Sequence, residues 1–182
     1  MNRLASSGQL RASFIRWAIF LVPLVLLLGY LSGEMSGSTA TTPWFEALEK
    51  PSIHPPAATF GIVWMFLYIL MGLALALVCS AWGALGRGLA ITVFLLQLAL
   101  NLAWSPVFFG LHQIEMALWI IIALDVLVIL TVILFWRVRR LAAVLLLPYL
   151  AWTLFATALN WQFLQLNPDA TEVSGAVERL EL

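Results

Sequence analysis

The chain has 182 residues, of which 63% are hydrophobic and only 10% are charged. Soluble domains average roughly 45–50% apolar and about 25% charged residues. The composition therefore excludes an ordinary soluble domain and predicts an integral membrane protein. Nine basic and nine acidic residues give a formal net charge of zero, so we expect no binding to nucleic acid. One cysteine and two widely separated histidines give no metal-ligand spacing, and no metal is expected.

Five long apolar runs follow one another along the chain, and they predict spans at about residues 14–33, 59–82, 88–109, 114–136 and 141–166. Runs of about 20 residues suit transmembrane helices, and their continuous rather than alternating apolar character excludes a β-barrel. We predict an all-α integral membrane protein, a bundle of five transmembrane helices over residues 14–166. A polar N-terminal segment, residues 1–13, precedes it, and a polar C-terminal tail, residues 167–182, follows it.

The basic residues predict how the chain is oriented. Seven of the nine lie in the first 16 residues, the turn at Arg87 or the turn at residues 137–140. With five spans these segments share one side, which the positive-inside rule places in the cytoplasm. The first loop and the C-terminus then lie on the opposite side. A cleavable signal peptide ending near Ser38-Thr39-Ala40 is the competing interpretation of the first run; we favour a span because the basic leader and the run are long for a signal.

The loop at residues 34–58 is polar and broken by prolines, which cannot sit inside a regular helix. It leads into a span whose Trp64 and Tyr68 are one helical turn apart. An irregular aromatic loop above such a helix is a candidate lid and wall for a ligand pocket. The candidate residues in this part of the chain are Trp44, Phe45, Pro55, Pro56, Trp64 and Tyr68.

Further aromatic and amide side chains fall inside the predicted spans. Trp64, Trp104, Trp119 and Trp152 lie away from the span ends or near expected kinks. They suit a wall for a flat ligand, and packing between helices explains them equally well. Amides such as Asn101 and Asn160 are usually hydrogen-bond partners between helices. Pro106 follows Asn101 and Trp104 and predicts a kink in the third span.

Asp125 is the only acidic residue well inside a span. A charge there costs about 2.5–3.5 kcal/mol on insertion scales, which makes such a residue a functional candidate. It could bind a proton, a cation or a ligand amine, or it could be a hydrogen-bonded residue at a helix contact. No basic residue lies in a span to pair with it, and both interpretations remain open.

Taken together, the motifs resemble the TspO/MBR family of tryptophan-rich sensory proteins and translocator proteins, also called peripheral-type benzodiazepine receptors. The first half of the resemblance rests on Trp44-Phe45, Lys50-Pro51, His54-Pro55-Pro56, Val63-Trp64, Tyr68 and Met71-Gly72. The second half rests on Gln97-Leu-Ala-Leu-Asn101, Trp104, Phe108-Phe109-Gly110, Pro148-Tyr149-Leu-Ala-Trp152 and Leu159-Asn160.

The resemblance implies a five-helix bundle, commonly a homodimer, with a pocket beneath the first loop. Its ligands would be porphyrins, haem-pathway tetrapyrroles and benzodiazepine or isoquinoline compounds. No cofactor is required, and porphyrin or haem is the expected ligand. Matched by position, the pocket under Trp44 and Phe45 includes Phe60, Gly61, Val63, Trp64, Met116, Trp119, Ala123, Ala156 and Leu159.

The chain also departs from the family pattern. The sterol motif at the end of the fifth span requires a basic residue after an aromatic one, and residues 161–165 contain none. Trp44-Phe45 replaces the more usual Trp-Tyr pair, and Ile53 stands where tryptophan is common. These departures weaken the expectation of sterol binding and leave the loop with one aromatic residue fewer.

Three functions are compatible with these features. The first is a membrane receptor or regulatory protein for tetrapyrroles, in which Lys50 or His54 meets a porphyrin carboxylate at the polar loop. The second is an enzyme that degrades porphyrin in light, because Trp64 and Trp152 resemble the tryptophans linked to that reaction in some bacterial relatives. The third is a transporter of tetrapyrroles or another small amphiphile, coupled to protons through Asp125.

Overall fold

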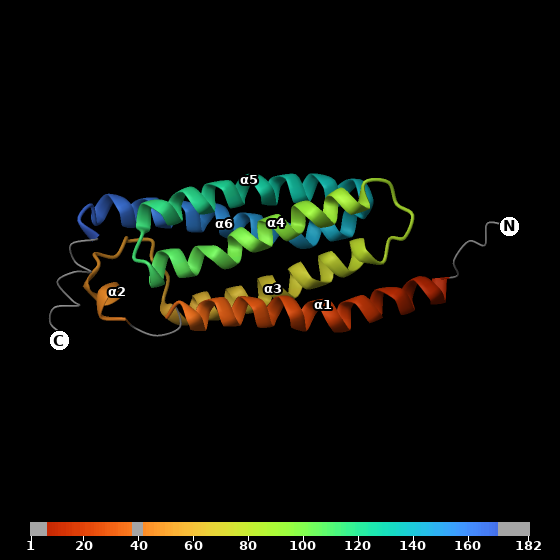
Figure 1. Ribbon diagram of the computed structural model, residues 1–182, viewed down its shortest axis with the longest axis horizontal. Helices are drawn as coiled ribbons and strands as arrows, with labels where there is room; N and C mark the ends of the chain where they lie inside the picture. The colour runs from red at the N-terminus through yellow and green to blue at the C-terminus, as the bar shows by residue number, and fades with distance from the viewer. Residues whose placement is uncertain (1–6, 38–41, 171–182) are drawn as a thin grey trace.

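The computed structural model describes residues 7–37 and 42–170. Within these ranges, five helices are long and apolar enough to cross a membrane. They are α1 (Ser7–Met35), α3 (Ala57–Cys79), α4 (Arg87–Ser105), which continues into the π-helical turn η1 (Pro106–Gly110), α5 (Ile114–Val138) and α6 (Arg140–Leu166). A short helix, α2 (Pro43–Ala47), lies in the first loop. The prediction of an all-α membrane bundle of five helices is confirmed (Figure 1).

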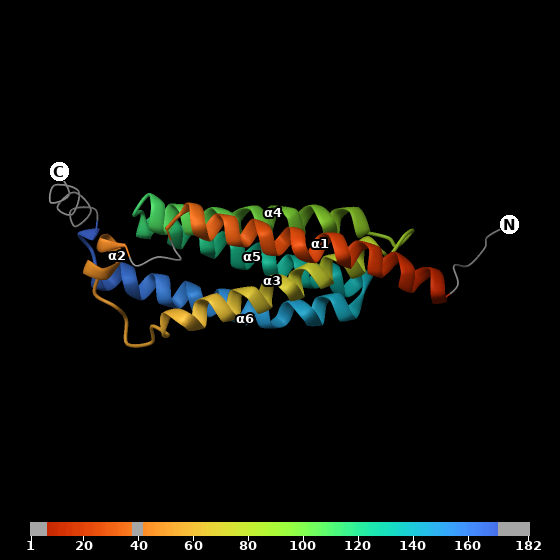
Figure 2. The same cartoon turned by 90° about the horizontal axis from the view of Figure 1, so that it is seen from below.

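The long helices run side by side, but their order in space differs from their order in the chain. Extensive contacts join α1 to α3, α3 to α6, α6 to α5 and α5 to α4, and smaller contacts between α1 and α4 close the ring. Figures 1 and 2 show α2 at one end of the bundle, beside the last turn of α6. We call this the lid end. The opposite end, which carries the α3–α4 turn, the α5–α6 junction and the start of α1, is the basic end.

The helix bounds differ from the predicted spans mainly in α1. This helix begins at Ser7 rather than at residue 14, because no helix-breaking residue separates the polar leader from the apolar run. Figures 1 and 2 show its first turns projecting beyond the other helices. The remaining bounds agree with the predicted ones to within three residues. Residues 1–6, 38–41 and 171–182 lie outside the described residues, and with them the candidate cleavage motif and most of the predicted tail.

At Pro106, where the sequence predicts a kink, the α-helical part of the third membrane helix ends and the π-helical turn η1 begins. Proline has no N–H group, so the carbonyl oxygen of Leu102, four residues earlier, loses its helical partner. The hydroxyl of Ser32 on α1 donates a hydrogen bond to this oxygen at 2.6 Å. Beyond the proline the chain forms η1, in which the N–H of Leu111 donates to the carbonyl of Pro106 at 2.9 Å. The kink therefore fixes α4 to α1 by a side-chain contact.

Two glycines allow α1 and α3 to pack closely. A Cβ atom added at Gly72 would lie 2.7 Å from the backbone of Val22, and one added at Gly29 would clash with the ring of Tyr68. Small residues at such contacts bring membrane helices together. Gly29 therefore leaves the space in which the Tyr68 ring sits at the bundle interior.

Candidate functional site

The lid is a short helix stabilised at both of its ends. At its start, the side chain of Thr42 accepts a hydrogen bond from the backbone N–H of Phe45, and Pro43 occupies the first helical position. At its end, the Nζ of Lys50 donates to the carbonyl oxygens of Phe45, Glu46 and Leu48 at 3.0, 3.2 and 3.4 Å. Lys50 thus satisfies carbonyls that a five-residue helix leaves without partners.

Trp44 anchors this lid to the body of the protein. Its side chain is only 2% exposed, and its ring stacks on His112 with the centroids 4.2 Å apart. Its indole N–H donates to the carbonyl oxygen of Ala170 at 3.2 Å. Trp44 is therefore held by the turn before α5 and by the segment after α6.

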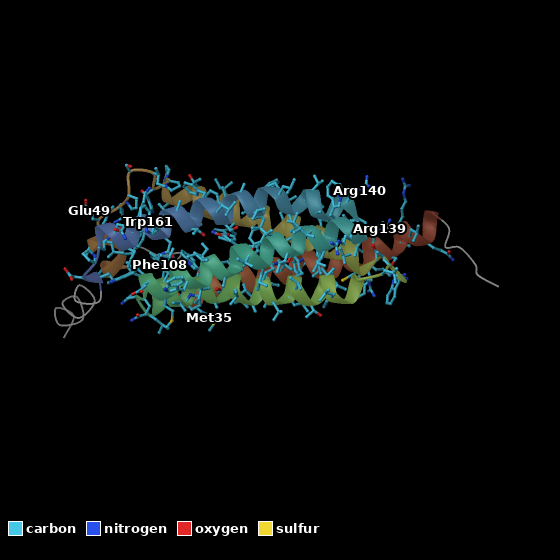
Figure 3. All side chains as sticks on the ribbon, turned by 90° about the horizontal axis from the view of Figure 1, so that it is seen from above. Met35, Glu49, Phe108, Arg139, Arg140 and Trp161 are labelled. Atoms are coloured by element: carbon cyan, nitrogen blue, oxygen red, sulfur yellow. The ribbon has the colours of Figure 1, made fainter. Side chains whose placement is uncertain are left out.

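Asn167 makes a second attachment, just past the end of α6. Its Oδ1 accepts a hydrogen bond from the backbone N–H of Glu49 at 2.8 Å, and its Nδ2 donates to the carbonyl oxygen of Glu49 at 3.0 Å. The same Nδ2 donates to the carbonyl of Phe163 at 2.9 Å, which orients the side chain. We call the paired contacts with Glu49 the lid clamp. Figure 3 labels Glu49 at the lid end, close to the labelled Trp161 of α6.

Aromatic rings extend from the lid into the space between α3 and α6. Phe45 contacts Phe163 with centroids 5.8 Å apart, and His54 contacts Phe60 at 5.4 Å. Phe60 on α3 in turn meets the edge of Trp152 on α6 at 5.8 Å. Below them, Trp64 stacks on Tyr68 at 5.3 Å. The aromatic cluster consists of Phe45, His54, Phe60, Trp64, Tyr68, Trp152 and Phe163.

Buried polar side chains continue from this cluster across three helices. The hydroxyl of Tyr68 donates to Oδ1 of Asn101 at 2.9 Å, and Nδ2 of Asn101 donates to the hydroxyl of Tyr149 at 3.1 Å. The Tyr149 hydroxyl donates in turn to Oε1 of Gln97 at 2.8 Å. This polar chain links α3, α4 and α6. Such pairing is required because an unpaired polar group buried in hydrocarbon costs several kcal/mol.

Asn160 makes a second polar contact between helices. Its Oδ1 accepts a hydrogen bond from the indole N–H of Trp104 at 3.0 Å, and its Nδ2 donates to the carbonyl of Ile114 at 3.0 Å. Both predicted amides, Asn101 and Asn160, therefore join helices to one another.

Asp125 lies at a contact between α5 and α6. Its side chain is 7% exposed, and its Oδ2 accepts a hydrogen bond from the hydroxyl of Thr157 at 2.7 Å. Its Oδ1 is buried and has no hydrogen-bond partner within residues 7–37 and 42–170. This geometry agrees with the interpretation of a hydrogen-bonded residue at a helix contact.

The structure brings most of the predicted site residues together. Apart from Gly61, those on α3, α4 and α6 pack against the bundle core or against the core beneath the lid, or, for Asn101 and Asn160, are buried and hydrogen-bonded there. They are Phe60, Val63, Trp64, Tyr68, Asn101, Trp104, Trp152, Ala156, Leu159 and Asn160. Pro55 and Pro56 lie at the lid end, where Pro56 is the residue immediately before α3.

Four predicted site residues do not join this group. Met116 and Trp119 are 53% and 64% exposed, and Ala123 and Gly61 are also exposed. The positions 116, 119 and 123 are spaced by three and four residues, so they share one face of α5. That face points away from the bundle, whereas Ala117 and the other buried residues of α5 point inward.

Sequence reasoning missed the residues that fasten the lid. Asn167 and Ala170 follow the last helix, and there they carry no apolar periodicity that would reveal a contact. His112 has a positive φ of 56° in the turn before α5, which presents its ring to Trp44. The one indication in the sequence was Asn167 itself, because an asparagine directly after a helix often forms hydrogen bonds with nearby backbone groups.

The lid holds one titratable histidine and one exposed cation. Partial burial, and then the nearby charge of Lys50, lower the pKa of His54 below its ordinary value of 6.5. The imidazole is therefore neutral at neutral pH. Lys50 supplies the positive charge of the lid, and its Nζ also lies 5.0 Å from the ring centroid of Phe45.

Comparison with known proteins agrees with this arrangement. The sequence model of the TspO/MBR family matches residues 20–166. Tryptophan-rich protein TspO of Chlorobaculum tepidum is 40% identical over 148 residues, which cover 81% of this chain and 93% of that protein. Tryptophan-rich sensory protein of Cereibacter sphaeroides is 35% identical over 163 residues, covering 86% and 96%. Translocator protein of Homo sapiens is 41% identical over 120 residues, covering 65% and 71%. The chain belongs to the TspO/MBR family, and it is an integral membrane protein that crosses the bilayer several times.

Proposed function

We propose that this protein is a membrane receptor that binds a porphyrin or a related tetrapyrrole between α3 and α6, beneath the lid. The observation that carries the proposal is the aromatic cluster, in which Phe60 of α3 meets Trp152 of α6 directly under the lid residues Phe45 and His54. A receptor role is also supported by the relatives, whose names include sensory protein and translocator protein.

The chemistry of the cluster suits a flat, apolar ring. Aromatic pairs contribute about 0.5–1.5 kcal/mol beyond the apolar area they bury. A macrocycle that enters between α3 and α6 has to separate the Phe60–Trp152 pair, and it replaces that contact with two stacking surfaces. Burial of its apolar faces adds roughly 25 cal/mol per Å². Binding is therefore favoured, because the macrocycle gains a larger stacked area against Phe60 and Trp152 than these two rings lose when they separate.

Two features of the lid suit the carboxylates of a porphyrin. The charge of Lys50 attracts an anion, and its contacts with three carbonyl oxygens hold the ammonium at the end of α2. His54 is neutral, so it offers a hydrogen bond rather than a permanent charge. We therefore assign the main electrostatic attraction to Lys50, with the macrocycle lying deeper, against Phe60 and Trp152.

Titration of the purified protein with protoporphyrin IX tests this proposal. Phe60→Ala removes one face of the site, and we expect the affinity to fall about 5- to 30-fold for the loss of about 1–2 kcal/mol. Trp136→Ala is the matched control, because Trp136 is a half-exposed aromatic residue at the end of α5 next to the basic end. Equal affinity for the wild type and Phe60→Ala would contradict the proposed position of the ligand.

A light-dependent enzyme is the second candidate function. It is favoured by the position of Trp64, which stacks on Tyr68 and contacts Tyr149, so that an electron donor lies within the cluster. The same titration, repeated under illumination, separates the two functions. A stable porphyrin absorbance band supports the receptor. Loss of the band in light, abolished in Trp64→Phe while binding persists, supports the enzyme.

A further inference from the structure

A hollow lies at the basic end, at the opposite end of the bundle from the aromatic cluster. It consists of two open depressions of about 350 and 380 Å³, which share Ser13, Arg16 and Trp82 among their lining residues and which we treat as one groove. We call it the basal groove; its walls include Ser13, Arg16, Trp17, Ser80, Trp82 and Arg139. It joins the start of α1 to the α3–α4 turn and the α5–α6 junction. Its volume is in the range of small-molecule sites, roughly 300–1,000 Å³.

The basal groove carries positive charge that no acidic residue neutralises within the described part of the chain. Arg16 and Arg139 line it, and neither makes an ion pair with residues 7–37 or 42–170. Figure 3 shows Arg139 and Arg140 at one end of the molecule and Glu49 at the other. The arginines Arg11, Arg16, Arg87, Arg137, Arg139 and Arg140 all belong to segments at or near the basic end. A ligand of the groove is therefore expected to be an anion.

The floor of the basal groove is polar as well as charged. Ser13 is only 8% exposed, and it lines both hollows of the groove. Ser80 is 7% exposed, and its hydroxyl donates to the carbonyl of Leu77 at 2.9 Å. Ser13 thus places a hydroxyl in the lining, beside two guanidinium groups that suit the oxygens of a phosphate.

Aromatic and apolar side chains continue from the groove along the outside of α1. Trp82 is 69% exposed, and the guanidinium of Arg87 lies 4.4 Å from its ring centroid. Arg87 is itself fixed by hydrogen bonds to the carbonyls of Val78 and Cys79 at 3.1 and 2.8 Å. On α1, Phe20 lines the groove and is 61% exposed, and Ile19 beside it is 70% exposed. An apolar surface therefore leads directly out of the charged groove.

From these observations we propose that the basal groove binds the phosphate headgroup of an anionic phospholipid from the adjacent leaflet. Arg16 and Arg139 would contact the phosphate, and the hydroxyl of Ser13 would donate to it. Trp82 and Trp17 would flank the glycerol at the depth where tryptophans gather in membranes, and an acyl chain would follow Phe20. Basic pockets between membrane helices bind lipid headgroups by this chemistry. The exposed apolar surface beside the groove favours a lipid over a small soluble anion, because only the lipid has an acyl chain that can contact this surface.

Binding of phosphatidylglycerol to the purified, delipidated protein, followed by native mass spectrometry, tests the proposal. The double variant Arg16→Gln/Arg139→Gln removes both guanidinium groups from the groove. We expect affinity to fall about fivefold for each arginine, and so roughly 25-fold in total. The matched control is Arg11→Gln/Arg137→Gln, which removes the same charge from exposed positions on α1 and α5 outside the lining; we expect a change of less than about twofold.

Three outcomes would overturn the assignment. Equal losses in the two double variants would show a general attraction of the basic end for anionic lipid rather than a site. Displacement of the lipid by millimolar inorganic phosphate would assign the groove to a soluble anion. Full affinity for phosphatidylglycerol in Arg16→Gln/Arg139→Gln would show that the lipid does not bind in the basal groove. An unchanged helical circular dichroism spectrum, and recovery of binding in Arg16→Lys/Arg139→Lys, show that loss of the contacts and not of the fold is measured.

Discussion

Replacement of Asn167 by alanine should open the lid while leaving the bundle intact. The substitution removes both hydrogen bonds of the lid clamp, the one that Glu49 N–H donates at 2.8 Å and the one that Glu49 accepts at 3.0 Å. A hydrogen bond contributes a net of about 0.5–1.5 kcal/mol. Because these two are exposed to solvent, we take the lower part of that range and expect a loss of about 1–2 kcal/mol.

Amide hydrogen exchange measures this loss at the residue concerned. The Glu49 N–H is protected by Asn167, so its exchange rate reports how often the clamp opens. A loss of about 1–2 kcal/mol corresponds to exchange about 5- to 30-fold faster. Amides in the middle of α3 and α6 should exchange at their wild-type rates, since no contact of these segments changes.

Asn167→Asp sharpens the experiment. Aspartate keeps an oxygen that accepts from the Glu49 N–H but loses the donor to the Glu49 carbonyl. We expect it to retain most of the protection at Glu49, whereas Gln165→Ala, an exposed position on the last turn of α6, should leave the rate unchanged. Wild-type exchange at Glu49 in Asn167→Ala would refute the reasoning, because the lid would then be held by Trp44 and its ring contacts alone.

Three further predictions concern the interior and the lid. Gly29→Ala makes a Cβ atom clash with the Tyr68 ring and should lower the stability of the protein by about 1–3 kcal/mol, measured as a lower midpoint of thermal unfolding. Gly61→Ala, whose Cβ meets nothing within 4 Å, is the control. Equal midpoints for the two variants would contradict the packing. The folded lid lowers the pKa of His54, so it is more stable with the imidazole neutral than with it protonated. The stability that the neutral His54 gives to the lid is complete above pH 6.5, and it is lost as the pH falls below that value toward the folded pKa. The rate of amide hydrogen exchange in the lid, corrected for the intrinsic exchange rate at each pH, should therefore rise as the pH is lowered. His54→Gln should abolish this rise. Asp125→Asn keeps an oxygen that accepts from the Thr157 hydroxyl, so the midpoint of thermal unfolding should be equal or higher. Asp125→Leu removes this acceptor and should lower the midpoint. An equally lowered midpoint in both variants would show that the carboxyl group itself is required.

The fold could be predicted from the sequence because few kinds of backbone structure can cross a lipid bilayer. Each apolar run is long enough to span, and only helices satisfy the backbone of a continuous apolar run in lipid. The start of α1 could not be placed, because the helix continues from Ser7 through polar residues that give no apolar signal. The order of the helices in space was also beyond the sequence, since it depends on close contacts such as that of Gly72 with Val22.

The candidate site was predicted in part for a similar reason. Residues such as Trp64 and Asn101 stand out because tryptophans and amides are unusual inside apolar runs, and both lie in the bundle. Met116 and Trp119 stand out equally, but the side of a helix that faces the bundle is set by packing, and α5 turns them outward. The one signal on α5 was Asp125, because an acidic residue in a span faces the bundle interior; Asp125 and Thr131 are buried on the inner face, and Met116 and Trp119 lie on the other side.

The residues that attach the lid and the rings between α3 and α6 belong to different parts of the chain, and this separation affects how binding is controlled. The match to the TspO/MBR family ends at residue 166, whereas Asn167 and Ala170 make the hydrogen bonds that hold the lid to the end of α6. If a ligand enters only when the lid opens, its apparent affinity and its rate of release depend on the fraction of open protein as well as on its contacts. Substitutions after α6 therefore change ligand residence while leaving Phe60, Trp64 and Trp152 in place. Asn167→Ala separates the two effects, because it should speed both entry and release of porphyrin, whereas Phe60→Ala should mainly speed release.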